Sequence, residues 1–184
     1  MAQNDSPTAV QFLEQQHEEI RQLFGQLETA TGDERREIFT CLVRLLAVHE
    51  TAEEEVVHPA VRAADGGREV VELRLKEEAE AKQALSELEQ AGPDAPDFST
   101  RLTALRTAVE SHASSEEQQE FTLLRNLHDQ DALRGMTTLL KAAEAIAPTH
   151  PHPHGPESAI GNLAVGPFVA VADRVRDAIS SARR

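Results

Sequence analysis

The stretches His49-Glu50-Thr51-Ala52-Glu53 and His112-Ala113-Ser114-Ser115-Glu116 repeat one pattern, a histidine followed four residues later by a glutamate. An α-helix turns by about 100° per residue, so residues four apart lie on the same face. In both stretches this face also carries the apolar residues of the segment. Burying an imidazole and a carboxylate is unfavourable unless a partner satisfies both groups. A metal ion does so, and the repeated pair suggests two metals.

The composition is typical of one small soluble domain. The chain has 184 residues, 40% of them apolar, which is enough to bury a single core. Its net charge of −14 argues against nucleic acid and anionic membranes as partners. Residues 1–8 contain no apolar run of the kind that signal peptides carry, and no membrane span is evident, so we expect a cytosolic protein. The single cysteine, Cys41, excludes internal disulfides, and we expect it to be a small core residue.

Apolar residues recur at helical spacing in four segments that end at Gly or Pro. The expected helices run from Ser6-Pro7 to about Thr31, from Asp33 to Asp65 with a kink at Pro59, from about Arg68 to Ala91, and from about Asp97 onward. Short loops favour antiparallel neighbours. The predicted fold is therefore all-α, an up-down-up-down four-helix bundle over residues 7–127.

The remainder of the chain is expected to extend the bundle by one or two further helices. Residues 128–147 form a weaker helical segment interrupted by Gly135, and residues 148–166 form a Pro/His-rich extended linker. Residues 167–184 have the pattern of an amphipathic helix. The linker carries three alternate histidines, His150, His152 and His154. We interpret them as solvated groups on a stiff tether, with a lid over the bundle as the alternative.

Each of the four helices has a ligand-type residue near the middle of its apolar stripe. These residues are His17, His49 with Glu53, Glu78, and His112 with Glu116. In an antiparallel bundle the midpoints of the helices meet at one level, so we expect these side chains to converge. On the third helix, Glu78 follows Leu75 by three residues and points inward, whereas Glu80 faces water.

Neighbouring histidine and glutamate residues are predicted to lie outside this cluster. His58 follows His49 by nine residues, so it points about 180° away on the same helix. Glu54 and Glu55 turn away as well and are interpreted as a solvated face. On the fourth helix, Glu117 is the alternative to Glu116 as the ligand carboxylate.

On these residues the chain resembles the hemerythrin-type HHE cation-binding domains, over about residues 8–127. The resemblance rests on His17-Glu18-Glu19-Ile20, on the run from His49 to Pro59 and on the run from His112 to Glu117. It implies two iron ions between four helices, bridged by carboxylates and an oxo or hydroxo group. By resemblance the roles divide into terminal ligands (His17, His49, His112), bridging carboxylates (Glu53, Glu116) and an additional ligand in some relatives (Glu50).

The third helix departs from the family pattern. The family supplies a histidine there, within a Glu-Glu-His-Ala-Glu-like run, but this chain reads Lys76-Glu77-Glu78-Ala79-Glu80-Ala81-Lys82. We expect Glu78 to replace the histidine as a ligand, and the alternative is an open metal position.

Oxygen and nitrogen donors suit iron, with manganese or zinc as alternatives. Four ionised carboxylates, those of Glu50, Glu53, Glu78 and Glu116, would balance the charge of two Fe²⁺ ions. The predicted function is a cytosolic non-haem di-iron protein that binds or reduces a small oxidant such as O₂, H₂O₂ or NO. Catalase-like or peroxidase-like turnover is favoured because no organic substrate pocket is evident. The alternative is an iron or oxygen sensor, or an iron-binding module without turnover.

Overall fold

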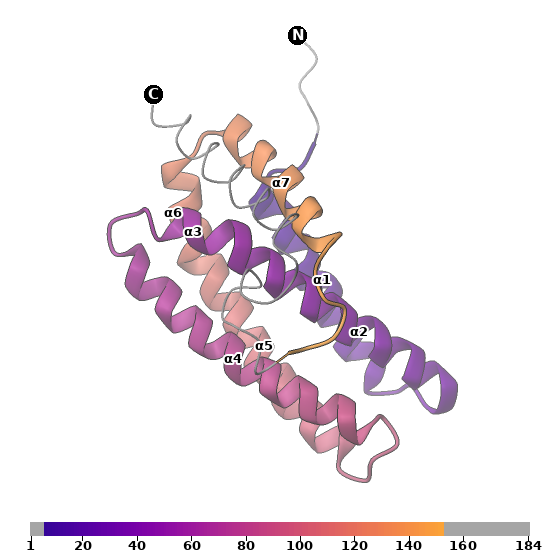
Figure 1. Cartoon of the computed structure of the whole chain (residues 1–184). Helices are drawn as coiled ribbons and strands as arrows, with labels where there is room; N and C mark the ends of the chain where they lie inside the picture. Colours follow the sequence, from indigo (N-terminus) through magenta and orange to yellow (C-terminus); the bar gives the residue numbers. More distant parts are fainter. Residues whose placement is uncertain (1–5, 153–184) are drawn as a thin grey trace.

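The computed structural model describes residues 6–152, which form helices and no strand. The helices are α1 (Ala9–Leu27), α2 (Gly32–Ala52), the π-helix η1 (Glu53–Val57), α3 (His58–Val61), α4 (Gly67–Ala91), α5 (Phe98–Gln118), α6 (Glu120–Leu127) and α7 (Gln130–Glu144), shown in Figure 1. The C-terminal part of the predicted linker and the predicted helix over residues 167–184 lie outside the described residues.

Four long helical arms form the predicted bundle. α1 packs against α2 and α5, and α4 packs against the same two helices, so the four enclose a common interior (Figure 1). The second arm continues from α2 through η1 into α3, and the fourth continues from α5 into α6. Short turns join successive arms, which makes neighbours in sequence antiparallel. The all-α bundle predicted from the sequence is confirmed.

The first helix begins two residues later than its Ser-Pro signal suggested. Thr8 is the N-cap, and its hydroxyl accepts a hydrogen bond of 3.3 Å from the backbone N–H of Gln11. The Gln11 side chain accepts in return from the backbone N–H of Thr8 at 3.0 Å. This reciprocal capping box satisfies two N–H groups at the helix start.

The second and fourth arms are each distorted at the same level of the bundle. In η1 the backbone N–H of His58 donates to the carbonyl of Glu53, five residues earlier, instead of four. Pro59 follows directly and has no N–H to donate, so the α-helical bond at its position is lost anyway. The kink predicted at Pro59 is therefore a π-helical turn placed just before it. In the fourth arm, Gln119 breaks the helix between α5 and α6.

The segment predicted as a weak extension is a regular fifth helix. α7 runs through Gly135 without a break and packs against α1, α2 and η1. Its buried side chains, Leu133, Met136, Leu140 and Ala143, join the core of the bundle. The amphipathic spacing of these residues compensates for the low helix propensity of the single glycine.

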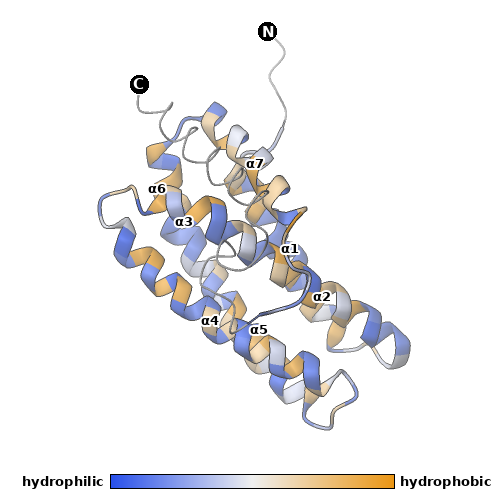
Figure 2. Cartoon of the chain, in the orientation of Figure 1, coloured by the Kyte–Doolittle hydropathy of each residue, from blue (hydrophilic) through white to orange (hydrophobic). Residues whose placement is uncertain are grey.

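The apolar core is divided into two clusters, one toward each end of the bundle. On α1, one cluster ends at Leu13, the other begins at Ile20, and His17 lies between them. The same interval on the other arms contains His49, Glu50, Glu78, His112 and Glu116, while Glu53 directly follows Ala52 of the first cluster. Figure 2 shows the resulting mixture of polar and apolar residues along each arm. Two apolar clusters thus enclose one polar layer.

Two further expectations concern the surface. Cys41 is exposed and is not the core residue we predicted, because it lies on the outer side of α2 next to the buried Leu42. Within residues 6–152, no helix combines the length and the apolar character needed to cross a bilayer.

Candidate metal centre

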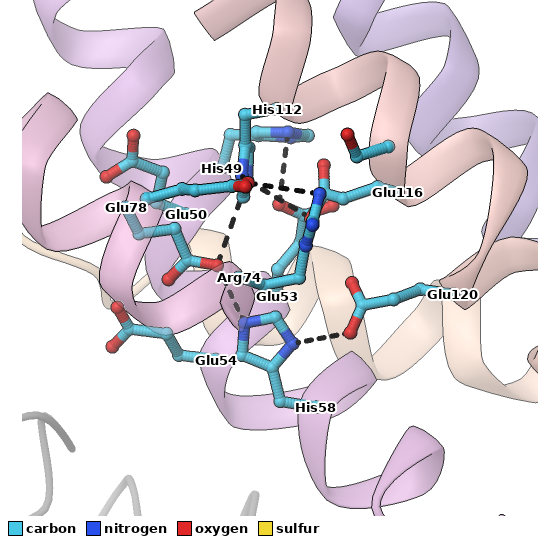
Figure 3. Close-up of polar contacts among 12 residues, drawn as sticks. His49, Glu50, Glu53, Glu54, His58, Arg74, Glu78, His112, Glu116 and Glu120 are labelled. Carbon is cyan, nitrogen blue, oxygen red and sulfur yellow. Dashed lines mark hydrogen bonds and ion pairs between the residues drawn. The ribbon is translucent and has the colours of Figure 1, made fainter. Parts of the chain in front are cut away.

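The polar layer brings together six of the seven predicted ligands. The six are His17, His49, Glu53, Glu78, His112 and Glu116, and each of them is buried. They come from α1, α2, η1, α4 and α5, so every arm of the bundle contributes at least one (Figure 3). The seventh, Glu50, lies beside them.

Glu116 occupies the centre of the layer and is fully buried. Its Oε2 atom lies 3.4 Å from Nε2 of His17, and its Oε1 atom lies 3.3 Å from Nε2 of His112. The two oxygens therefore face two different histidines. This is the arrangement expected of a carboxylate that bridges two cations.

The donor atoms fall into two groups that share Glu116. One group consists of His17, His49, Glu53 and Glu116, and the other of Glu78, His112 and Glu116. Within each group one donor atom from every residue lies within 4.8 Å of the others. Nε2 of His49 also lies 3.3 Å from Oε2 of Glu53, four residues along the chain. Each group could hold one cation.

Several of these donor atoms are buried without a hydrogen-bond partner. They are Nε2 of His17, Nε2 of His112, both carboxylate oxygens of Glu53 and of Glu116, and one oxygen of Glu78. A buried acceptor that lacks a donor is destabilising by about 1–3 kcal/mol. So many in one layer is unusual for a packed core. A cation would satisfy them together, so the residues present fit a metal.

The other ring nitrogen of each histidine has a partner, which fixes which nitrogen carries the proton. Nδ1 of His17 donates to Glu117 at 2.9 Å, Nδ1 of His112 donates to Glu77 at 3.0 Å, and Nδ1 of His49 donates to the side-chain oxygen of Gln16 at 2.9 Å. All three Nε2 lone pairs therefore point into the layer when the rings are neutral. Partners of this kind orient the ligands of metal sites.

The metal-free protein compensates its buried carboxylates with protons. Burial raises the pKa of Glu53 well above its ordinary value, and the carboxylates of Glu116 and Glu78 raise it further. Burial also opposes ionisation of Glu116, but the nearby charge of His112 outweighs it and holds the pKa of Glu116 well below its usual range. Burial and the charge of His17 lower the pKa of His49 to about 3. A cation would therefore displace protons as it bound.

A small cavity of about 20 Å³ adjoins the layer. Its lining includes the ring of His49, the carboxyl of Glu50 and the apolar side chains of Ile20, Leu46 and Val109. A space of this size admits one or two molecules as small as water.

A family model described as the hemerythrin HHE cation binding domain matches residues 8–124. The chain belongs to this family. Domains of this kind bind metal cations, and the match spans every one of the residues we predicted as ligands.

Two known proteins are similar to this chain in sequence. A DNA nickase from Nostoc sp. is 31% identical over 130 residues, which are 70% of this chain but only 37% of the nickase. An uncharacterized hemerythrin-like protein from Schizosaccharomyces pombe is 28% identical over 135 residues, which are 72% of this chain and 66% of that protein. The chain thus spans less than two thirds of either relative.

A solved structure shows the same fold. It is the crystal structure of a hemerythrin HHE cation binding domain-containing protein from Mycobacterium kansasii, with a TM-score of 0.65 and 22% sequence identity. The alignment covers 76% of this chain and 88% of that one.

The seventh predicted ligand of this HHE domain, Glu50, belongs to neither group of donors. Its Oε2 atom lies 3.9 Å from the ammonium of Lys82, which also pairs with Glu54. Burial raises the pKa of Glu50 to about 8, against the opposing charge of Lys82. Glu54 is therefore part of a half-buried ion pair and not of the solvated face we predicted, and Glu55 is buried.

The prediction that His58 points to solvent is wrong. His58 is 1% exposed and lies beneath the metal layer, where Nε2 donates to Glu78 at 2.7 Å and Nδ1 lies 3.3 Å from Glu120 (Figure 3). The angular argument assumed an unbroken α-helix, whereas η1 contains an extra residue per turn. Burial disfavours the charged ring, but the hydrogen bonds and charges of both glutamates outweigh it and raise the pKa of His58 to about 10.

Two other buried residues of the HHE domain were missed. Arg74, only 1% exposed, lies 3.0 Å from Glu77, the carboxylate that holds His112. Glu120 is fully buried at the start of α6. Spacing could have indicated Arg74, because it precedes Glu78 by four residues on the same face. The same spacing could have indicated Glu120, because it follows Glu116 by four residues.

Glu117, the predicted alternative to Glu116, has a different place. It lies outside both donor groups, half-buried, and accepts hydrogen bonds from Nδ1 of His17 and from the guanidinium of Arg21 at 2.8 Å. The structure therefore favours Glu116 as the carboxylate of the layer and assigns Glu117 to the outer partners of the histidines.

Proposed function

We propose that the polar layer binds two metal cations, one in each donor group, with Glu116 shared between them. The observation that carries this proposal is the convergence of three imidazoles with three carboxylates, of which Glu53 and Glu116 lack a hydrogen-bond donor on both oxygens and Glu78 lacks one on a single oxygen. The predicted ligand roles of His17, His49, Glu53, Glu78 and His112 follow from the same convergence. We do not include Glu50 among the ligands, because Lys82 neutralises its charge.

We propose iron as the native metal, because the donors are imidazole nitrogens and carboxylate oxygens without thiolate. Manganese prefers the same donor atoms, and zinc is the redox-inert alternative. Two adjacent iron ions would supply electrons in pairs to a small oxidant. The three neutral imidazoles and the ionised carboxylates would hold the ions, while His58 keeps the carboxylate of Glu78 in a single orientation.

The oxidant we propose is H₂O₂, with O₂ and NO as alternatives. The cavity of about 20 Å³ beside His49 has room for a molecule of this size and for no larger organic substrate. Disproportionation of two H₂O₂ molecules to O₂ and two water molecules balances without an external reductant. The apolar walls of the cavity limit escape of reactive oxygen species.

The nickase relative raises nucleic acid as a substrate, and we propose that this chain does not act on it. The aligned region is only 37% of the nickase. The net charge of −14 opposes contact with a phosphate backbone. The predicted cytosolic location likewise stays a prediction.

Peroxide turnover after anaerobic loading with Fe²⁺ tests the proposed function. We expect O₂ release from H₂O₂ by the loaded protein, and none from metal-free protein or from the Glu116→Ala variant. Incubation with supercoiled plasmid is the second assay. Plasmid nicking by the loaded protein without peroxide turnover would contradict the proposal and favour the activity named for the relative.

A further inference from the structure

A chain of hydrogen bonds connects His49 to the last described helix. Nδ1 of His49 donates to Oε1 of Gln16 at 2.9 Å, and Nε2 of Gln16 donates to Oε1 of Glu144 at 2.6 Å. Gln16 is 8% exposed, so water has little access to replace either bond. Glu144 is the last residue of α7, 128 positions away from Gln16.

The other two histidines are held differently. His17 and His112 donate directly to carboxylates, those of Glu117 and Glu77, and an arginine contacts each carboxylate. An anionic partner raises the basicity of a ligating imidazole. His49 has a neutral amide in this position, with the carboxylate one residue further out. The donor strength and orientation of its ring therefore depend on how the amide is turned.

Glu144 determines this orientation. A side-chain amide can present either its oxygen or its NH₂ group to a neighbour. A carboxylate only accepts, so Glu144 selects the NH₂ group of Gln16 and leaves the amide oxygen for His49. The oxygen can accept only if Nδ1 carries the proton, which leaves Nε2 free to face Glu53.

α7 is fixed firmly enough to serve this purpose. Leu140 and Ala143, close to the end of α7, are buried in the core cluster. One turn earlier, the hydroxyl of Thr137 donates to the backbone carbonyl of Pro7 at 2.9 Å. These contacts place the carboxyl of Glu144 over α1, where Gln16 lies.

We propose that Glu144 is a positioning residue for His49 and that α7 is therefore part of the metal centre, although the family match ends at residue 124. The part of this inference that concerns metal affinity rests on the proposed function. The part that concerns the tautomer of His49 does not.

Four variants separate the hydrogen bond from the packing of α7. Glu144→Leu removes the acceptor, whereas Glu144→Gln keeps the length of the side chain but can present either an oxygen or an NH₂ group to Gln16, so the selection by an acceptor-only group is lost. Thr138→Leu adds the same apolar side chain at an exposed position of α7 and is the matched control. Glu144→Ala removes the acceptor without adding apolar surface, in case the leucine variant loosens the helix.

The first readout is the ring-nitrogen spectrum of His49 in the metal-free full chain, measured by ¹⁵N NMR. We expect a proton on Nδ1 in the parent chain and in Thr138→Leu, and a mixture of tautomers in Glu144→Gln, Glu144→Leu and Glu144→Ala. The second readout is Zn²⁺ affinity, measured by competition with a chelator. In Glu144→Leu and Glu144→Ala we expect one of the two Zn²⁺-binding steps to weaken by about 10–100-fold and the other to stay unchanged.

The outcomes distinguish the two proposals. Failure of the parent chain to bind metal would overturn the proposed function. The tautomer of His49 in the variants would still show whether Glu144 positions its ring. If Glu144→Leu and Glu144→Ala match Thr138→Leu in the tautomer of His49, the positioning role is wrong. Weakening of both binding steps by equal amounts would also contradict it, because the effect would then be a general loosening of the bundle.

Discussion

At the scale of single residues, His58 is a buried histidine held between two buried carboxylates. Its protonated ring lies between Glu78 and Glu120, all three side chains are almost inaccessible to water, and both ring nitrogens face a carboxylate. Such an ion pair is a weak source of net stability, but removing one partner leaves an uncompensated charge. His58 thereby holds Glu78 in place beneath the metal layer.

We expect His58→Leu to lower the free energy of unfolding of the metal-free protein by about 3–5 kcal/mol, because two buried carboxylates lose their donor. Denaturant unfolding measures this difference. The control is His150→Leu, since His150 is exposed and pairs with Glu89 near the surface. It should change stability by less than about 1 kcal/mol. Equal effects of the two substitutions would contradict the buried ion pair.

The same histidine predicts a pH dependence. The pKa of His58 rises from an ordinary value of 6.5 to about 10 on folding, so the folded state binds a proton that the unfolded chain releases. Its stabilising contribution is complete below about pH 6.5 and is lost as the pH rises through 10. The pKa of His112 is also raised to about 10 and acts in the same direction. Unfolding measured from pH 7 to 10 should show falling stability, with a smaller slope in His58→Leu.

Substitutions of Glu116 and Glu50 compare the carboxylate that both donor groups share with a neighbouring carboxylate outside them. Glu116 belongs to both donor groups, whereas Glu50 belongs to neither. Glu116→Ala should weaken both metal-binding steps by more than the roughly 10–100-fold that loss of an outer partner causes. Glu50→Ala should weaken them by less than that. Metal titration by calorimetry measures both, and a larger loss in Glu50→Ala would restore Glu50 as a ligand.

At the scale of elements, the π-helix η1 determines which residues of the second arm face inward. Five residues of η1 cover the turn that four residues of an α-helix would cover, so His58 lies on the same side as Glu53. Sequence spacing predicted correctly the residues before this turn, including His49 and Glu53. It failed for His58 and Glu55, because periodicity alone does not reveal an extra residue. A weak signal was available in the consecutive apolar pairs Val56-Val57 and Ala60-Val61, all four of which are buried.

The extra residue of η1 should be dispensable. Deleting Glu54 would convert the turn to α-helical geometry without rotating the residues on either side, although its ion pair with Lys82 would be lost. Deleting the exposed Arg44 from α2 would rotate one half of the arm by about 100° against the other. We expect metal stoichiometry to survive the first deletion and not the second. Loss of metal in both would show that the π-turn itself is required.

α7 shows how packing can override local propensity. Gly135 was expected to interrupt this segment, but the helix is continuous and a Cβ atom at Gly135 would meet nothing within 4 Å. Gly135→Ala should therefore stabilise the protein by about 0.5–1 kcal/mol with unchanged metal content. At Gly67 a Cβ would lie 1.9 Å from the carbonyl oxygen of Val61, so Gly67→Ala should destabilise it. Thermal melting of both variants checks the contrast, and destabilisation by Gly135→Ala would contradict it.

At the scale of the whole molecule, a polar layer separates two apolar clusters. The sequence was sufficient to predict the bundle and the convergence of six ligand-type residues, because both follow from helical periodicity and short loops. The outer partners were not predictable in this way. Gln16 and Glu77 contact histidines of the layer, and Glu144 contacts Gln16, because different helices pack together, which helical periodicity does not reveal.

Because the layer connects all four arms, occupancy by metal should stabilise the entire fold. Two cations present at about 100 times their dissociation constants would each contribute roughly 2.7 kcal/mol, which together should raise the melting temperature by about 10–20 °C. Limited proteolysis near His150, with and without metal, extends the test to the predicted sensor alternative. Faster cleavage there in the metal-free protein would favour a sensor, and identical cleavage would contradict it.

The most direct test of the account is the number of metal ions per chain in purified protein, measured by elemental analysis of the parent chain and the Glu116→Ala variant side by side. The account predicts about two ions per chain in the parent, predominantly iron, and fewer than one in the variant. An absence of metal from the parent, or equal metal content in both proteins, would contradict the proposed two-cation centre.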